Sequence, residues 1–509
     1  MSMEHFPPLM FAGLVFVMLI GFPVAFSLGA LGLACGFYAI EMGWFPAAFM
    51  ANLPLNVFGI LSNDLLLAIP FFTFMGTILE KCGLAEDMLD SMGQLFGPMR
   101  GGLGYSVIIV GFILGAITGT VAGQVIAMAL ISLPVMVRYG YNMRYATGVL
   151  AASGTITQLV PPSLVLVVLA DQLGRPVGDM YKGAWGPSLL QIAIFILYTY
   201  LLGRIKPSYV PGVPIEARTL NGWALWSKCL RGIIPSAVLI FAVLGSMGGL
   251  PGLDVALATP TEAGAMGCVG ALILAAMHKR LTRGLMWEAM SGTMRLTAMV
   301  VFILIGSRVF SMVFQGVDGN KWVEHMLSNL PGGQIGFLIA VNIFVFFLAF
   351  FLDFFEIAFI IVPMLAPVAD KLGIDLIWFG VLLCVNMQTS FMHPPFGFAL
   401  FYLRGIADTL YKEKRLEKPV KSSDIYMGSI PWVIMQLILV AVVIFVPQTV
   451  TAFLDKPVTV DINTVTIDAP ENVEYGNDSN DANANMPSPP PAEEEDPMKA
   501  LQEATKKGN

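Results

Sequence analysis

Apolar segments of about 20 residues recur along the chain, separated by short polar or basic stretches. A helix needs about 20 residues to cross the hydrocarbon core of a bilayer, so the pattern predicts an all-α polytopic membrane protein. The simple predicted spans are 9–21, 24–40, 64–79, 183–202, 233–248, 261–277, 296–314 and 427–446. The pattern leaves open whether residues 9–40 form two spans or one.

Two further apolar stretches, 103–137 and 334–368, are too long for one simple span. Each carries polar or charged residues near its middle, which a lipid-facing span would avoid. We therefore expect each stretch to be a re-entrant helical hairpin that enters and leaves the membrane on the same side.

Two more segments, 145–170 and 376–402, are interrupted in the same way. The first contains SGTITQLVPPS (153–163), and the second contains NMQTSFMHPPFG (386–397). Because proline removes a backbone donor and clashes with the preceding turn, each Pro-Pro pair predicts an unwound helix. Irregular backbone at membrane depth is tolerated only where protein or a water-filled cavity surrounds it, and a pair of such breaks is typical of a transporter's binding site.

The same order of elements occurs twice, with a hairpin followed by a broken helix in each half. Basic residues favour cytoplasmic loops, and their positions predict that the two hairpins open on opposite sides of the membrane. We expect an inverted repeat with ten crossings and both termini in the periplasm. Its parts are a first repeat at 1–206, a cytoplasmic linker at 207–231, a second repeat at 232–450 and a disordered acidic, proline-rich tail at 455–509.

Composition narrows the class of function. Hydrophobic residues make up 56% of the 509 positions and charged residues 12%, against roughly 25% charged in soluble domains. The sequence has no basic patch for nucleic acid, no metal-ligand spacing among its five cysteines, and no Walker A, HExxH or GxSxG motif. We therefore expect a protein that is not an enzyme.

Hard oxygen atoms, which suit a sodium ion, gather at the two breaks and at the centres of the hairpins. Unwound helices also expose carbonyls, and half-helix ends supply dipoles for ions. The alternative is that these small polar residues only pack helices together. The polar groups concerned belong to Thr118, Thr120, Gln124, Ser153, Thr155, Thr157, Asn386, Gln388, Thr389 and Ser390.

Three charged residues lie inside apolar segments. Asp353 and Glu356 occur in FLDFFEIAF, with a spacing that places both on one helical face. A buried acid is costly in a membrane, so both are functional candidates. Arg308, in LIGSRVFSMVF, could bind a substrate carboxylate through two hydrogen bonds or pair with an acid for structure. The candidate substrate-binding residues are Thr157, Gln158, Asn386, Gln388 and Arg308.

Four dispersed motifs resemble the large membrane subunit of tripartite ATP-independent periplasmic (TRAP) transporters and occur in the same order along the chain. They are LLLAIPFFTFMG, SGTITQLVPPS, ATPTEAGAMG and FLDFFEIAFIIVP. The resemblance extends from about residue 10 to residue 447. It implies sodium-driven uptake of an organic acid, such as a C4-dicarboxylate, a keto acid or sialic acid, across the bacterial inner membrane. The implied mechanism is an elevator, in which the hairpins and broken helices move against a scaffold.

The resemblance also implies two partners and a set of sodium ligands. The partners are a small four-helix membrane subunit, expected as a separate polypeptide, and a periplasmic substrate-binding protein. Carried over by motif, one sodium site involves Ser153, Gly154 and Thr155 with the first hairpin tip, and another involves Thr389 with Asp353. Sodium would be the coupling ion, and no other cofactor is expected.

This chain departs from the commoner family pattern at both hairpin tips. The first reads AITGTVAGQ where many relatives have a serine-rich tip with an Asp, and the second reads FLDFFEI where many have a proline after the Asp. Two alternatives stay open. One is a self-sufficient sodium/anion symporter of similar architecture. The other is a membrane enzyme or a scaffold without transport, which would leave the paired broken helices without a purpose.

Overall fold

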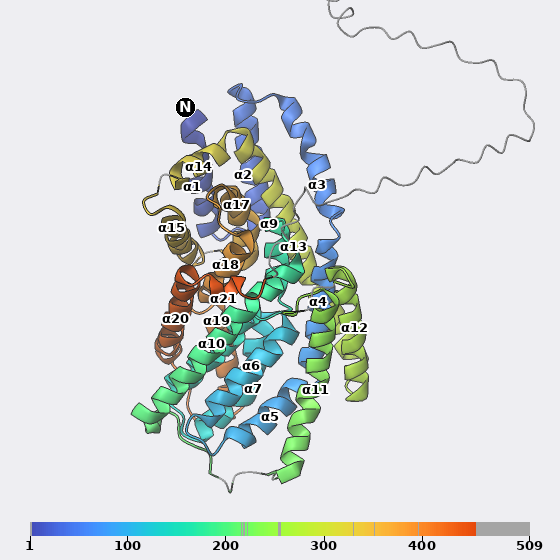
Figure 1. Ribbon diagram of the computed structural model, residues 1–509, viewed down its shortest axis with the longest axis vertical. Helices are drawn as coiled ribbons and strands as arrows, with labels where there is room; N and C mark the ends of the chain where they lie inside the picture. The colour runs from blue at the N-terminus through green and yellow to red at the C-terminus, as the bar shows by residue number, and fades with distance from the viewer. Residues whose placement is uncertain are drawn as a thin grey trace, which may run out of the picture. The chain divides into compact units, whose positions relative to one another are not determined.

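The computed structural model describes residues 3–214, 216, 219–220, 222–252, 256–328, 330–350, 352–394 and 397–454. Throughout these residues the regular structure is helical, with no strand (Figure 1). This confirms the predicted all-α fold class. The tail predicted at 455–509 lies outside the described residues.

The first half contains a hairpin and a broken helix, as predicted. Gly119, with a positive φ of 62°, makes the turn between the two arms of this hairpin, and glycine adopts that conformation without steric cost. The helices are α1 (Phe6–Leu19), α2 (Val24–Glu41), α3 (Leu53–Leu61), α4 (Leu65–Lys81), α5 (Leu84–Phe96), the hairpin arms α6 (Gly102–Thr118) and α7 (Val121–Arg138), the broken helix α8 (Met143–Thr155) and α9 (Leu164–Leu173), and α10 (Val177–Ile205). Short 3₁₀ turns lie at Met3–His5, Ala47–Asn52, Ile156–Gln158 and Pro207–Tyr209.

The second half repeats this order, and its hairpin lies toward the opposite end of the molecule. Figure 1 places α5, α6 and α7 toward the bottom and α14, α15 and α17 toward the top. The helices are α11 (Gly222–Ser246), α12 (Pro260–Met277), α13 (Arg283–Gly316), α14 (Gly319–Ser328), the hairpin arms α15 (Gly333–Leu348) and α16–α17 (Phe354–Glu356 and Val362–Lys371, joined by a π-helix, η6, at Ile357–Ile361), the broken helix α18 (Leu376–Ser390) and α19 (Phe398–Lys412), α20 (Ser422–Phe445) and α21 (Gln448–Thr451).

Membrane-spanning character follows from the length and composition of the helices. Seven helices among the described residues are long and apolar enough to cross a bilayer, or eight if the bent pair 47–61 and 65–81 counts as one span. Large apolar side chains remain exposed along them, as lipid-facing surfaces require. The protein is therefore a multi-pass membrane protein.

Two details of the sequence-based organisation are resolved by the structure. Residues 9–40 form two helices, because Gly21 turns the chain between α1 and α2 with a φ of 91°. The predicted linker at 207–231 is only partly a connection, because α11 already begins at Gly222. The other domain boundaries stay predictions.

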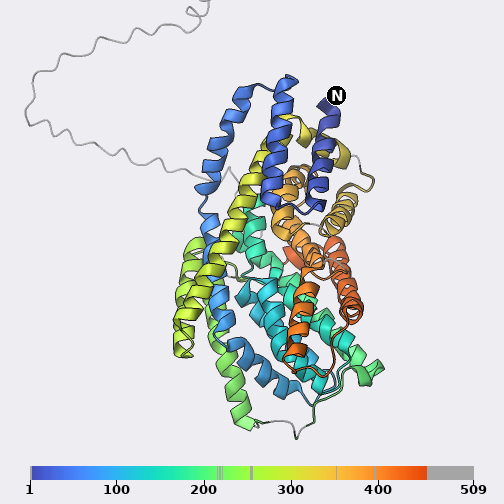
Figure 2. The same cartoon turned by 180° about the vertical axis from the view of Figure 1, so that it is seen from behind.

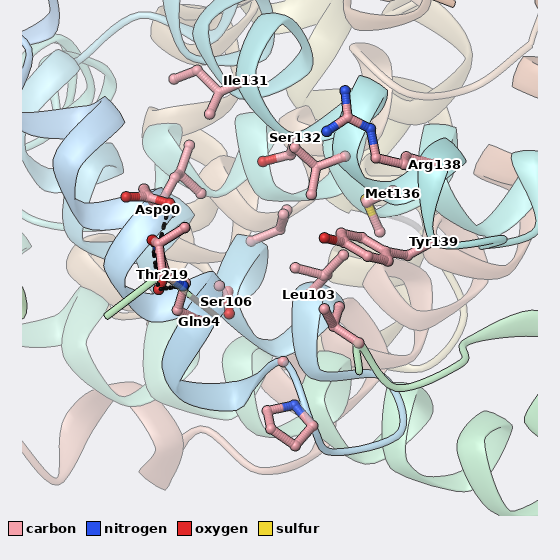
Figure 3. Close-up of a pocket in the computed structure, with 17 residues that line it drawn as sticks. Asp90, Gln94, Leu103, Ser106, Ile131, Ser132, Met136, Arg138, Tyr139 and Thr219 are labelled. Carbon is pink, nitrogen blue, oxygen red and sulfur yellow. Dashed lines mark hydrogen bonds between the residues drawn. The ribbon is translucent and has the colours of Figure 1, made fainter. Parts of the chain in front are cut away.

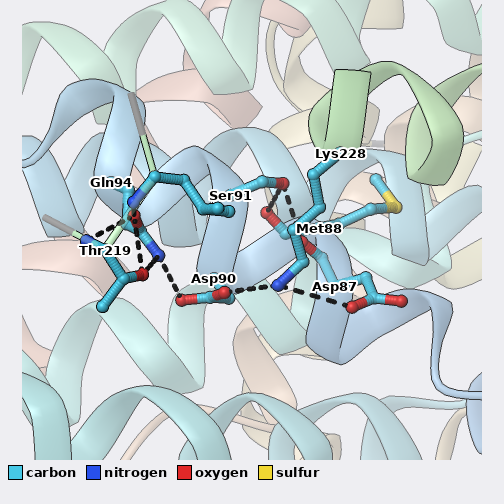
Figure 4. Close-up of polar contacts among 8 residues, drawn as sticks. Asp87, Met88, Asp90, Ser91, Gln94, Thr219 and Lys228 are labelled. Carbon is cyan, nitrogen blue, oxygen red and sulfur yellow. Dashed lines mark hydrogen bonds and ion pairs between the residues drawn. The ribbon is translucent and has the colours of Figure 1, made fainter. Parts of the chain in front are cut away.

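The connection between α10 and α11 is fastened to α5 by polar contacts (Figure 4). Lys228 on α11 contacts Asp90 at 2.6 Å and Asp87 at 3.6 Å, and Gln94 bonds Thr219. Burial alone would raise the pKa of Asp90, but hydrogen bonds from Lys228 and Gln94 outweigh it and hold that pKa below its usual value. The amphipathic helix α5 is thus anchored to the start of the second half.

A close approach joins α8 to α20, and glycines make it possible. An added Cβ at Gly148 would lie 2.2 Å from the Gly428 carbonyl oxygen, and one at Gly428 would lie 2.2 Å from the Arg144 carbonyl oxygen. Backbone atoms cannot move aside as a flexible side chain can. Small residues at such positions let membrane helices pack closely.

We expect Gly428→Val to destabilise the protein strongly, because the new side chain would push α20 away from α8. Overpacking of this kind costs about 1–3 kcal/mol or more. Gly405→Val on α19 is the matched control, since a Cβ at Gly405 meets nothing within 4 Å. The measurement is thermal unfolding of the purified protein in detergent. Equal stability of the two variants would contradict the close packing of α8 on α20.

Candidate functional site

The first hairpin and the first broken helix are joined through one buried side chain, Gln124 on α7. Its Nε2 donates to the carbonyl oxygens of Gly111 at 2.6 Å and Ser153 at 2.7 Å. Its Oε1 accepts a hydrogen bond from the hydroxyl of Thr157, which also donates to the Gly154 carbonyl at 2.7 Å. Gln124 therefore holds both hairpin arms and the end of α8 in one hydrogen-bond network.

The tip of the first hairpin faces the proline break. Gly119 and Thr120 line one small void together with Pro162 of the break and Thr73 of α4. Thr120 lies at the N-terminal end of α7 with an extended backbone. Thr118 is the last residue of α6, and its side chain lies outside what the structure describes. Thr120 therefore lies beside Pro162 of the break, and the sodium site expected of the tip with Ser153, Gly154 and Thr155 stays a prediction.

The hydroxyls of the first break point back into their own helix. Ser153 donates to the Leu150 carbonyl and Thr155 donates to the Ala152 carbonyl, both at 3.0 Å. The proton of each hydroxyl is thereby donated to a carbonyl of its own helix, while the lone pairs of the hydroxyl oxygen can still accept a hydrogen bond or bind a cation. Thr155 uses one of them to accept a hydrogen bond from Gln436 of α20 at 3.1 Å.

The two broken helices contact each other. The hydroxyl of Thr155 lies 3.3 Å from the sulfur of Met392 in the second break. The Cys384 thiol of α18 donates to the Gln158 carbonyl of the first break at 3.2 Å. Two segments more than 200 positions apart in the sequence are thus in contact. The similarity of their motifs did not by itself predict this contact.

The second break is organised like the first. The hydroxyls of Thr389 and Ser390 donate to the carbonyls of Asn386 at 2.6 Å and Met387 at 2.5 Å. The amide of Asn386 donates to the carbonyl of Asn342 on α15 at 2.8 Å, which ties this break to the second hairpin. Each break is therefore bonded to the hairpin of its own half.

Several buried amide atoms around the breaks lack a hydrogen-bond partner among the described residues. They include the side-chain oxygens of Gln158, Asn342 and Asn386. Gln191 of α10 donates to the Gln388 oxygen at 2.7 Å, but its own oxygen has no partner. Buried polar atoms are rarely left unpaired. Unpaired oxygens suit a cation or a substrate donor, so these residues fit the oxygen-rich chemistry expected of the site.

Asp353 and Glu356 form a helix cap. Asp353 is the N-cap of α16, and its carboxylate accepts from the Phe354 backbone N–H at 2.6 Å. Glu356 reaches back to accept from the Asp353 N–H at 2.9 Å. Among the described residues, neither acid is paired with Arg308, and no hydrogen bond joins Asp353 to Thr389. The reciprocal bonds of this capping box fix the start of the second hairpin arm.

Arg308 lies apart from the other substrate-binding candidates. The neighbouring Ser307 donates to the Phe359 carbonyl at 2.6 Å, which holds α13 against the second hairpin. Arg308 itself lines a separate cavity with Asp171 at the end of α9. The structure therefore brings together Thr157, Gln158, Asn386 and Gln388 near the meeting breaks, and places Arg308 elsewhere.

Sequence reasoning missed three polar residues of this region: Asn342, Gln191 and Gln436. Each is a lone buried amide in an otherwise apolar helix. Such a residue in a predicted span signals a buried partner, since an unpaired amide is costly in a membrane. The partner itself cannot be read from the pattern.

A separate cavity of about 240 Å³ lies at the base of the first hairpin (Figure 3). Figure 3 shows Arg138, Tyr139 and Ser132 on one side of it and Asp90 and Gln94 on the other. None of the predicted site residues lines this cavity. The predicted site therefore lies at the hairpin tips and breaks, away from this opening.

Comparison with known proteins identifies the family. The model of the family described as "Tripartite ATP-independent periplasmic transporter, DctM component" matches residues 11–449. The chain belongs to this family. Members are subunits of transporters, so the chain is a TRAP large permease subunit and not an enzyme.

Individual relatives cover nearly the same span. The C4-dicarboxylate TRAP transporter large permease protein DctM of Vibrio cholerae is 26% identical over 470 residues, which are 87% of this chain and 96% of that protein. The 2,3-diketo-L-gulonate TRAP transporter large permease protein YiaN of Escherichia coli is 25% identical, covering 85% and 95%. The isethionate TRAP transporter permease protein DctMQ of Oleidesulfovibrio alaskensis is 25% identical, covering 81% of this chain and 62% of that protein.

A solved structure shares the fold. The crystal structure of the Alcanivorax borkumensis YdaH transporter matches with a TM-score of 0.53 and 16% sequence identity, covering 77% of this chain and 86% of that one. This likeness supports the all-helical transporter architecture and nothing finer.

We expect Gln124→Leu to lower the stability of the protein, because it leaves the Gly111 and Ser153 carbonyls and the Thr157 hydroxyl without the partner that they share. An unsatisfied buried polar group costs about 1–3 kcal/mol. Gln94→Leu is the control, since Gln94 makes its bonds at an exposed site. Thermal unfolding in detergent compares the two. If Gln124→Leu is no less stable than Gln94→Leu, the network does not hold the hairpin to the break.

Proposed function

We propose that this subunit carries an organic acid anion across the bacterial inner membrane, driven by an inward sodium gradient. The observation that supports this most directly is the meeting of two broken helices, each bonded to its own hairpin, through Thr155 and Met392. Such breaks supply oxygen ligands and helix dipoles at membrane depth, where ion and substrate sites of secondary transporters lie.

Sodium coupling is the proposed role of the hydroxyl-rich residues at the breaks. The ligand set at the first break would be Ser153, Gly154 and Thr155 with the hairpin tip. The set at the second would be Thr389 and Ser390 with Asp353. Hard oxygen atoms of this kind suit a small monovalent cation.

The proposed movement is that of an elevator. The hairpins and broken helices, α6–α9 and α15–α19, would form the mobile part. The remaining helices, including α2, α4, α12 and α13, would form the scaffold. This division accords with bonds that join each hairpin to its own break and each break to the other, so that these elements can move as one body.

The substrate class comes from the relatives. The Vibrio cholerae protein is named for C4-dicarboxylates, and the Escherichia coli protein for 2,3-diketo-L-gulonate. Both ligands are carboxylate anions. We therefore propose a small carboxylate as the substrate, delivered by a periplasmic binding protein. A small membrane subunit would complete the transporter, with both termini of this chain in the periplasm.

The test is uptake into proteoliposomes that hold this chain and its small subunit, with the cognate binding protein outside. A radiolabelled C4-dicarboxylate serves as the probe under an imposed sodium gradient. The proposal predicts uptake that needs both sodium and the binding protein. Sodium-driven uptake without that protein would instead show a self-sufficient symporter, and uptake indifferent to sodium would contradict the coupling.

Within the same assay, Thr155→Ala and Thr389→Ala should each weaken sodium activation, because each removes a hydroxyl oxygen from a proposed ligand set. We expect the half-saturating sodium concentration to rise about tenfold, which corresponds to about 1.4 kcal/mol. Thr409→Ala is the control, since the exposed Thr409 hydroxyl likewise bonds a main-chain carbonyl of its own helix but lies outside the breaks. An unchanged sodium curve in both site variants would rule out these ligand sets.

A further inference from the structure

A polar cavity of about 260 Å³ lies where α3 and the α3–α4 turn meet α9 and α13, toward the upper end of Figure 1. It takes no part in the site described above. Its volume is just below the range of about 300–1,000 Å³ typical of pockets for drug-sized ligands, so it suits a smaller molecule. The polar side chains that line it are Asn56, Asn63, Asp171, Gln172 and Arg308.

Arg308 is the cationic residue of this cavity; it belongs to the C-terminal part of the long apolar helix α13, and the residue is exposed. A charged side chain at such a position is costly unless it is paired or lines a wet cavity. The acids of the second hairpin, Asp353 and Glu356, are engaged in their own capping box. Within the part of the chain that the structure describes, no acid lies within ion-pair distance of Arg308.

Asp171, the acid of the cavity, already has partners for both oxygens. Asn63 donates to one oxygen at 2.8 Å, and Gln172 donates to the other at 2.8 Å. Because these two amides already bond its oxygens, the Asp171 carboxylate needs no hydrogen bond from Arg308. The guanidinium therefore remains available in a partly polar cavity, and its planar fork of donors matches the two oxygens of a carboxylate.

The cavity continues toward the tip of the first hairpin along a narrow seam between α4 and α9. Leu66 and Asp171 line both the Arg308 cavity and the next void along the seam. That void has a volume of only about 10 Å³, and the void beyond it, at Thr120 and Pro162, has none that a water could occupy. The seam thus leads from Arg308 to the first break and is closed along its length.

We propose that the Arg308 cavity is a receiving subsite for a small carboxylate anion, placed at the boundary between the scaffold and the mobile part and outside the transport site. The inference rests on the proposed function and deepens it. The anion would bind to Arg308 while the seam is closed, and it would pass between α4 and α9 to the hairpin tip when the mobile part moves. Because Arg308 belongs to α13 and Asp171 to α9, such a movement would change the shape of the subsite.

The charge of the cavity can be tested without transport. Gly59 lines the cavity, and a Cβ added there meets nothing within 4 Å, so Gly59→Cys introduces a thiol without removing a polar contact. The variant is made with Cys35→Ser, because the other four cysteines are buried. The measurement is its rate of reaction with the anionic sulfonatoethyl and the cationic trimethylammonioethyl methanethiosulfonates, each relative to free cysteine.

The subsite predicts that the anionic reagent is favoured over the cationic one by about tenfold, the effect of one nearby charge worth about 1.4 kcal/mol. Adding Arg308→Gln should abolish or reverse this preference, because Asp171 then sets the field, while Arg308→Lys should keep most of it. Succinate should slow labelling by the anionic reagent in the presence of Arg308 and not in Arg308→Gln. A preference for the cationic reagent, or a ratio unchanged by Arg308→Gln, would overturn the proposal.

Uptake separates this inference from the proposed function. Arg308→Gln in the proteoliposome assay should raise the KM for the C4-dicarboxylate by about tenfold or more and leave the half-saturating sodium concentration unchanged. If the unmodified protein shows no sodium-driven uptake, the proposed function fails, whatever the labelling shows. If uptake is sodium-driven but its KM does not respond to Arg308→Gln, the receiving subsite is contradicted while the proposed function stands.

Discussion

Buried polar groups inside a membrane need partners from the protein, because lipid offers none, and this constraint shapes the centre of the molecule. Gln124 meets it in the first half by bonding Gly111, Ser153 and Thr157 at once. In the second half, the side-chain amide of Asn386 donates a hydrogen bond to the Asn342 carbonyl. Each break therefore depends on its hairpin, and a hairpin that moved alone would leave buried carbonyls unpaired.

From this dependence follows a group of elements, the two hairpins and the two breaks, that are bonded to one another. The two breaks contact each other through Thr155 and Met392 and through Cys384 and Gln158. Around them, α4 meets the tip of the first hairpin and α9 across small voids, and α13 is bonded to the second hairpin through Ser307. Substrate-binding chemistry would then lie within the mobile part, at the breaks, and the anion-receiving cavity at Arg308 would lie at its boundary with the scaffold.

The sequence was most informative where local chemistry overrides helix formation. The proline pairs at 161–162 and 394–395 predicted the two breaks, and the length and polar centres of two apolar stretches predicted the two hairpins. The i, i+3 spacing of Asp353 and Glu356 was interpreted as a shared helical face, although the same spacing also marks a capping box, which the structure contains. The partners of Gln191 and Gln436 could not be predicted, because a lone amide in an apolar span shows a need for a hydrogen bond but not its direction. Arg308 was a candidate for substrate binding or for a structural ion pair, but its position apart from the breaks depends on helix packing that no motif encodes.

The measurement that tests the central claim most directly is hydrogen–deuterium exchange of the purified protein in sodium chloride and in potassium chloride at equal ionic strength. If the breaks and hairpin tips form the sodium sites, sodium should slow exchange in the peptides that contain residues 115–125 and 153–163, and Thr155→Ala should abolish that protection. The long helix α13 should exchange equally in both salts. Identical exchange of the two breaks in sodium and in potassium would contradict the account.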